Sequence, residues 1–181
     1  TARRHALQVR VYEPTATPQL ALFLNVSTAE QAWLGTDVAV LEGAITATAS
    51  LARYALQEGY AVGVFANAPL LQSDQPLRVR PGSSPQQLTT ILEGLAKLNA
   101  FMIEPLESTV EREGRRLPWG ATVVVVTGVM SAGLAVALTR LRQAGRPTVL
   151  IVFGDAAAGP LPDGAIVHTL DGERLLSGFA A

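Results

Sequence analysis

The sequence predicts an α/β domain with a doubly wound, mostly parallel sheet and helices on both of its faces. Two patterns predict this fold class. Short apolar runs at residues 20–24 and 123–126 are typical of strands that are covered on both faces. These runs alternate with segments whose apolar residues recur at helical spacing, and strands that alternate with helices pair in parallel. The composition, 49% hydrophobic and 16% charged, excludes a disordered chain.

In the first half of the chain we expect a strand over residues 7–12, a loop containing prolines, and a buried strand over residues 20–24. A helix over residues 38–58 follows, because its apolar residues line one side, Asp37 suits its N-cap and Gly59 suits its end. Residues 60–66 form the next strand. Residues 76–80 are a short antiparallel edge strand, whose arginines either guard the edge against strand addition or contact a partner: Arg78 and Arg80.

Two helices are expected between residues 84 and 113. Ser84, Pro85 and Gln87 have the pattern of a helix start, with Ser84 as the cap. The buried stripe of this helix consists of Leu88, Ile91, Leu92, Leu95 and Leu98. The second helix, over residues 105–113, is mostly polar, with Leu106 and Val110 facing inward. Its charges predict a solvated face with ion pairs between turns: Glu104, Glu107, Glu111, Glu113, Arg112, Arg115 and Arg116.

The uncharged stretch over residues 117–139 is long enough to cross a membrane. Its pattern instead favours a strand over residues 121–126, a turn at Thr127 and Gly128, and a helix over residues 132–144 capped by Ser131. Gly145 suits the end of this helix, and residues 148–153 and 165–169 are the last two strands. We therefore expect that this part of the protein does not contact a membrane.

The chain is expected to hold one domain. Residues 1–18 form a strand and loop that lead in from an upstream region, residues 19–170 form the domain, and residues 171–181 form a tail. Residue 1 is a threonine and no secretory leader pattern follows it, so we expect a piece of a longer protein.

Composition argues against several functional classes. Fourteen Lys and Arg against fifteen Asp and Glu leave no broad basic surface for nucleic acid. The absence of cysteine excludes thiolate metal sites and a cysteine nucleophile, and it fits a cytoplasmic location. The two histidines, His5 and His168, argue against a histidine-based zinc site. Glycine-rich phosphate loops and the G-x-S-x-G pattern are absent, so we expect no catalytic residues and no cofactor.

Several segments carry a family resemblance through their order and spacing. Residues 7–14 read LQVRVYEP and precede the apolar strand that ends in Asn25-Val26-Ser27. Residues 59–65 read GYAVGVF and precede residues 81–84 and the leucine-rich residues 88–98. With the valines before Thr127, these segments resemble domain-of-unknown-function family 58 over about residues 7–155. The resemblance implies a von Willebrand factor A-like fold.

The resemblance also implies a divalent-cation site at the carboxyl ends of the strands, built from an Asp-x-Ser-x-Ser loop and two further loops. This sequence departs from it at Asn25, Ala29 and Gly128, while Ser27 matches. Because Mg²⁺ prefers hard oxygens that include a carboxylate, we expect a degenerate site without metal. If Mg²⁺ does bind, Ser27, Glu30 and Asp37 are its expected ligands. The site loops form the candidate interaction surface: Asn25, Ser27, Thr28, Ala29, Asn67, Ser83, Ser84, Thr127 and Gly128.

Members of this family resemble partners of MoxR-type AAA+ ATPases, and many carry membrane helices upstream of the domain. The first hypothesis is therefore a non-catalytic protein-interaction or scaffold domain that works with such an ATPase. On this hypothesis, bulky residues at Ser27 and Thr127 abolish partner capture without changing the melting temperature. One alternative is a cation-dependent ligand-binding domain with a remodelled site. Another is a small-molecule enzyme in the same crevice, which a well-formed pocket beside Ser27 favours.

Overall fold

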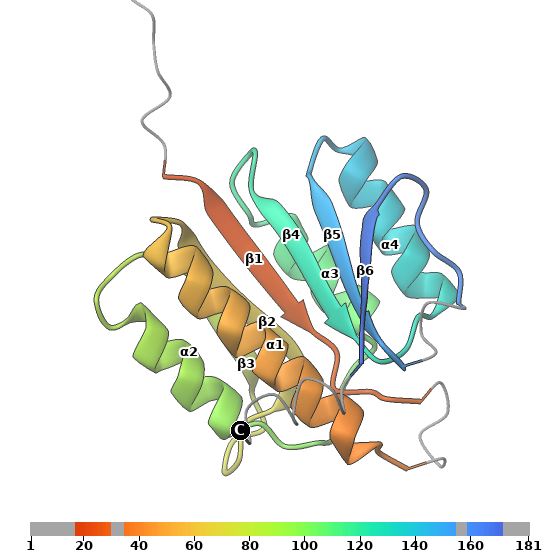
Figure 1. The fold of residues 1–181 in the computed structure, drawn as a ribbon, viewed down its shortest axis with the longest axis horizontal. Coiled ribbons are helices and arrows are strands. Elements are labelled where there is room, and N and C mark those ends of the chain that lie inside the picture. The colour runs from red at the N-terminus through yellow and green to blue at the C-terminus, as the bar shows by residue number, and fades with distance from the viewer. Residues whose placement is uncertain (1–16, 30–34, 155–158, 172–181) are drawn as a thin grey trace, which may run out of the picture.

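The computed structural model describes residues 17–29, 35–154 and 159–171. The predicted strand over residues 7–12 lies outside these residues. The described part forms a sheet in the order β3-β2-β1-β4-β5-β6 (Figure 1). Its strands are β1 Gln19–Leu24, β2 Ala61–Pro69, β3 Pro76–Gly82, β4 Thr122–Thr127, β5 Thr148–Phe153 and β6 Ile166–Leu170. Its helices are α1 Val38–Gln57, α2 Gln87–Ala96, α3 Leu106–Gly114 and α4 Ala132–Gln143.

The sheet is parallel except at one edge. β1 pairs in parallel with both β2 and β4, and β5 continues the parallel order to β6. β3 pairs antiparallel to β2, with Val64 opposite Val79. The predicted fold class and its antiparallel edge strand are both confirmed.

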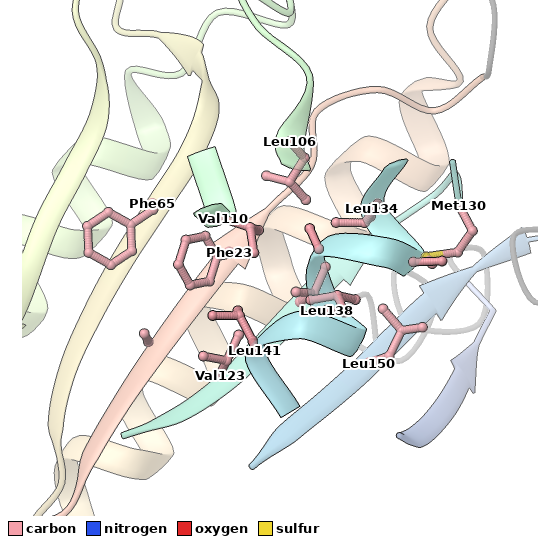
Figure 2. Close-up of a cluster of buried hydrophobic side chains, with 14 of the residues drawn as sticks. Phe23, Phe65, Leu106, Val110, Val123, Met130, Leu134, Leu138, Leu141 and Leu150 are labelled. Atoms are coloured by element: carbon pink, nitrogen blue, oxygen red, sulfur yellow. The ribbon is translucent and has the colours of Figure 1, made fainter. Parts of the chain in front are cut away.

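Helices cover both faces of the sheet, α1 and α2 on one and α3 and α4 on the other (Figure 1). The alternation of side chains along β1 builds both cores. Leu22 and Leu24 face α1 and α2, where alanines of α1 allow close packing. Phe23 faces the other core, stacks on Phe65 with ring centroids 5.1 Å apart, and lies near α3 and α4 (Figure 2).

The ends of the longer helices follow the sequence signals. The Asp37 carboxylate accepts a hydrogen bond from the Val40 N–H, and the Ser131 hydroxyl oxygen accepts one from the Leu134 N–H. Gly59 follows α1 with a φ of 82°, a conformation that glycine adopts without a steric penalty. The uncharged stretch over residues 117–139 forms β4, a turn and α4. Within the described residues, no helix is long and apolar enough to cross a membrane.

Three local expectations are wrong. Ser84 does not cap α2, because Gln87 uses its side-chain amide to donate to Val62 O and Arg80 O across the β2–β3 edge. Leu92 is 43% exposed, because α2 buries a narrow stripe against the sheet. β2 continues past residue 66 to Pro69, so Asn67 lies inside a strand and is fully buried.

The close approach of β3 to Gly63 gives a stability prediction. A Cβ at Gly63 would lie 2.6 Å from Pro81 N and 2.8 Å from Val79 O, which are backbone atoms that cannot turn aside. Gly63→Ala should therefore lower the free energy of unfolding by about 1–3 kcal/mol in urea denaturation. The matched control is Gly94→Ala, whose Cβ meets a terminal methyl of Leu77 and which gains helix propensity. Equal effects of the two substitutions would contradict this explanation.

Candidate functional site

A buried polar network joins the carboxyl ends of the three central strands, β2, β1 and β4. Asn25 Nδ2 donates to Thr127 Oγ1 at 3.0 Å, and Asn67 Nδ2 donates to Asn25 Oδ1 at 2.9 Å. Asn67 Oδ1 accepts from the Val26 N–H at 3.0 Å, and Asn25 Oδ1 also accepts from the Ser27 N–H at 3.1 Å. The two amides therefore fix the first residues of the loop after β1.

The threonine completes this network on the β4 side. Thr127 Oγ1 donates to Val129 O at 2.6 Å and accepts from the Val129 N–H at 3.1 Å. Among the described residues, no buried side-chain nitrogen or oxygen lacks a hydrogen-bond partner. We call Asn25, Asn67 and Thr127 the amide network. Its three side chains carry no charge, and their buried nitrogen and oxygen atoms all have hydrogen-bond partners.

The amide network does not fit a divalent cation. The Asn25 oxygen already accepts two hydrogen bonds, and the Thr127 oxygen accepts two and donates one. A cation would have to displace these bonds and would gain no carboxylate, whereas Mg²⁺ and Ca²⁺ usually require one. The described residues hold no cluster of three or more metal-ligating side chains of the His, Cys, Asp and Glu types. Glu30, one of the expected ligands, lies outside the described residues.

The structure separates the predicted surface residues into three groups. Asn25, Asn67 and Thr127 are buried and lie beneath the surface instead of on it. Ser83 and Ser84 follow β3, which runs antiparallel, so they lie near Val62 at the opposite edge of the sheet. They do not lie with the other predicted residues, because the antiparallel β3 ends where β2 begins.

The remaining predicted residues stay together at the carboxyl edge. Ser27, Thr28 and Ala29 line a cleft of about 590 Å³. Gly128 lies just beneath it, where a Cβ would collide with Val40. Asp37 is the N-cap of α1, and its backbone N–H donates to Thr28 Oγ1 at 2.8 Å. The rest of the described lining comes from the loop after β1, from the segment before α1, and from the loops that lead into α3 and α4 together with the first residues of these helices. These residues are Asn25, Val26, Gly35, Thr36, Ala100, Phe101, Met102, Pro105, Leu106, Glu107, Val129, Ser131 and Ala132.

Three consecutive apolar residues are exposed beside this cleft, and the first two of them, Phe101 and Met102, line it. Phe101, Met102 and Ile103 are 66%, 40% and 42% exposed. We call them the apolar rim. Their loop is held to the end of β2, since the Asn99 N–H donates to Pro69 O and the Ile103 N–H donates to Asn67 O, both at 3.0 Å. The sequence interpretation missed this feature, although a run of three apolar residues between two helices was a signal for it.

Glu104 anchors the other end of the loop to α3. Its carboxylate accepts two parallel hydrogen bonds from the Arg112 guanidinium and one from Thr109 Oγ1 at 2.6 Å. The hydrogen bonds from Arg112 lower the pKa of Glu104 from 4.5 to about 2. The apolar rim is therefore presented on a loop that is fixed at both ends.

The charged face of α3 is less solvated than its pattern predicts. Glu113 is buried, and one of its oxygens lies 3.1 Å from Arg112 Nε and 3.4 Å from both Arg116 Nη1 and Arg78 Nε. Arg78 therefore ties the edge strand β3 to α3 and does more than guard the edge. Glu111 lies on the surface as predicted, but it pairs with Arg140 of α4 and not with a residue of its own helix.

Glu107 is also less exposed to solvent than its position on the charged face of α3 predicts. It lines the cleft at the start of α4, where its Oε2 lies 3.5 Å from the Ser131 hydroxyl oxygen. A Cβ at Gly133 would lie 2.4 Å from Glu107 Oε1, so the glycine makes room for the carboxylate. Its place in the cleft depends on packing between α3 and α4, which the sequence pattern alone does not reveal.

Replacing Asn25 tests the amide network. Asn25→Asp removes the Nδ2 donor to Thr127 and places a carboxylate in a buried site. We expect a loss of about 1–3 kcal/mol in the free energy of unfolding. Because burial disfavours the ionised form, the loss should be larger at about pH 7 than at about pH 5. Chemical denaturation at both pH values checks this, with the exposed Asn99→Asp as the control, and equal small losses in both variants would contradict it.

The Glu104 pair gives a pH prediction. A carboxyl whose pKa is lowered on folding stabilises the protein above its unfolded pKa, and this stabilisation is lost as the pH falls from 4.5 to about 2. Glu104→Gln should therefore cost about 1 kcal/mol near neutral pH, since the pair is partly solvated, and progressively less toward the acid limit. Urea denaturation against pH checks this. Glu111→Gln, in the exposed pair, is the control, and a pH-independent deficit in Glu104→Gln would contradict the assignment.

Comparisons with known proteins agree with the fold. The sequence matches no protein-family model and no curated protein. The structure is similar to the crystal structure of the SpRpn10 VWA domain, with a TM-score of 0.56 and 8% identity over 90% of this chain and 95% of that one. It is also similar to a von Willebrand factor type A protein from Catenulispora acidiphila, with a TM-score of 0.51 and 13% identity over 91% of this chain and 42% of that one.

These likenesses bear on the fold alone, because the sequence identities are low. Membership of domain-of-unknown-function family 58 and an association with MoxR-type ATPases stay predictions. The chain has a von Willebrand factor A-like fold, with an amide network at the edge of the sheet where the resemblance implied a cation.

Proposed function

We propose that the domain is a non-catalytic protein-interaction module that binds its partner at the cleft without a metal ion. The observation that carries this proposal is the apolar rim, Phe101, Met102 and Ile103, exposed beside the cleft on a loop fixed at both ends. Exposed apolar residues that stand next to each other are a liability in a soluble domain unless a partner covers them. Covering one such side chain contributes about 1.5–3 kcal/mol to binding before the costs of association.

The fixed backbone of the loop supports the same proposal. Hydrogen bonds at Asn99, Ile103 and Glu104 hold the apolar rim in one conformation. A binding surface that is already ordered loses less conformational entropy when the partner arrives. The amide network next to this loop is also held by hydrogen bonds, and it carries no charge.

The chemistry of the described lining argues for binding over catalysis. The Ser27 hydroxyl donates to the Met102 sulfur at 3.1 Å, and no basic side chain of the described residues lies within hydrogen-bond distance of it. A serine nucleophile requires such a base. We therefore propose that Ser27 positions the apolar rim through Met102.

We propose a MoxR-type AAA+ ATPase, in the cytoplasm, as the first partner to test. This choice is supported by the family resemblance of residues 7–155 and not by the fold, which many unrelated functions share. Binding to this ATPase is a separate question from binding at the cleft, and it is tested separately below.

A second candidate function is the binding of a small molecule. The cleft volume of about 590 Å³ lies within the range of about 300–1,000 Å³ that is usual for ligand sites. The exposure of the apolar rim favours the protein partner, since a small ligand inside the cleft would leave Ile103, which does not line the cleft, uncovered.

A photo-crosslinking experiment tests the location of the interface. A photoreactive phenylalanine analogue replaces Phe101 in one variant and the 85% exposed Trp119 in a control, because Trp119 lies at the opposite edge of the sheet before β4. Each variant is irradiated with the purified MoxR-type ATPase of the same organism and, separately, with an extract of that organism. We expect crosslinks to the ATPase from position 101 only. Crosslinks to other proteins from position 101 only would retain the interface and reject the ATPase. Equal or absent crosslinks at both positions would contradict the proposed function.

A further inference from the structure

The cleft carries a negative charge that the protein does not neutralise within its described part. Among the described lining residues, Glu107 is the charged one. It is half-buried, and within the described residues its polar contact is the Ser131 hydroxyl at 3.5 Å, the outer limit of a hydrogen bond. The Ser131 oxygen also accepts from the Leu134 N–H at 3.0 Å. The Glu107 carboxylate therefore retains most of its capacity to accept hydrogen bonds.

The other carboxylates near α3 show what Glu107 lacks. Glu104 is paired with Arg112, Glu111 with Arg140, and Glu113 with three arginines. No ion pair of this kind is formed by Glu107 in the part of the chain that the structure describes. A half-buried carboxylate loses part of its hydration, and a cation from outside would compensate for that loss.

The surroundings of the cleft reinforce its negative sign. Asp37 lies at the same edge, where its carboxylate caps α1 and remains exposed. Lys97, at the end of α2 near this edge, is paired with Glu93 at 3.7 Å. A partner that binds this surface would contact one carboxylate, that of Glu107, beside the apolar rim.

We propose that the cleft binds a segment of the partner in which a lysine or arginine stands next to a bulky apolar residue. The cationic side chain enters the cleft and pairs with Glu107, while the apolar side chain packs on Phe101, Met102 and Ile103. This inference rests on the proposed function and specifies the chemistry of the partner.

A selection from a phage-displayed library of random peptides tests the inference. The wild-type domain should enrich peptides with Lys or Arg beside an aromatic or aliphatic residue. Peptides synthesised from these sequences should bind Glu107→Gln about 5- to 10-fold more weakly by calorimetry, and they should bind more weakly as the ionic strength rises. Glu111→Gln, on the exposed side of the same helix, is the matched control and should bind like the wild type. A selection on Glu107→Lys should enrich acidic peptides instead.

The outcomes separate this inference from the proposed function. Peptides that lose affinity on Phe101→Ser and show no preference for basic residues would overturn the inference and leave the interface in place. Enrichment of acidic peptides by the wild-type domain would also overturn it. No enrichment, or affinity that is unchanged in both Phe101→Ser and Glu107→Gln, would overturn the inference and the proposed interface together. Thermal melts that match the wild type verify that the variants are folded.

Discussion

The amide network is the constraint on which the carboxyl edge of this domain depends. Parallel strands end with backbone groups that need partners, and the loops after β1 and β4 begin at the same place. The side chains of Asn25, Asn67 and Thr127 satisfy these groups with neutral donors and acceptors. Buried polar groups of this kind are costly if one partner is missing, so the three residues act as one unit. A carboxylate at Asn25 would change both the charge and the donor pattern.

The amide network also fixes the strand end that carries the proposed binding surface. The end of β2 is fixed by Asn67, and the loop of residues 98–105 attaches to it through Pro69 and Asn67 carbonyl oxygens. Glu104 and Arg112 fix the other end of the loop to α3. The apolar rim and Glu107 therefore lie at the same ordered cleft, which suits a partner that offers an apolar and a cationic group. The protein-interaction role is a proposal that this arrangement supports.

Much of the fold could be predicted from the sequence, because local signals agree with the tertiary structure. Apolar runs predicted the central strands, and Asp37, Gly59 and Ser131 marked helix ends.

Predictions failed where a distant segment decided the outcome. Gln87 bonds to two strands and leaves Ser84 without a capping role. Glu113 in α3 is buried and pairs with Arg78 of β3, which is distant from it in the sequence. The site residues after β1 were predicted from the loops that the family resemblance implies, and Ser83 and Ser84 were grouped with them. The antiparallel β3 places these two serines at the other end of the strands, and the position of Glu107 depends on the packing of α3 against α4.

The most direct test of the account is amide hydrogen exchange, measured residue by residue by NMR with EDTA and with excess Mg²⁺. The N–H groups of Val26, Ser27 and Val129 donate to side chains of the amide network. The account predicts that these three amides exchange slowly in EDTA and that Mg²⁺ changes neither their rates nor their chemical shifts. Fast exchange in EDTA that becomes slow with Mg²⁺ would show that a cation, and not the amide network, organises this edge of the sheet.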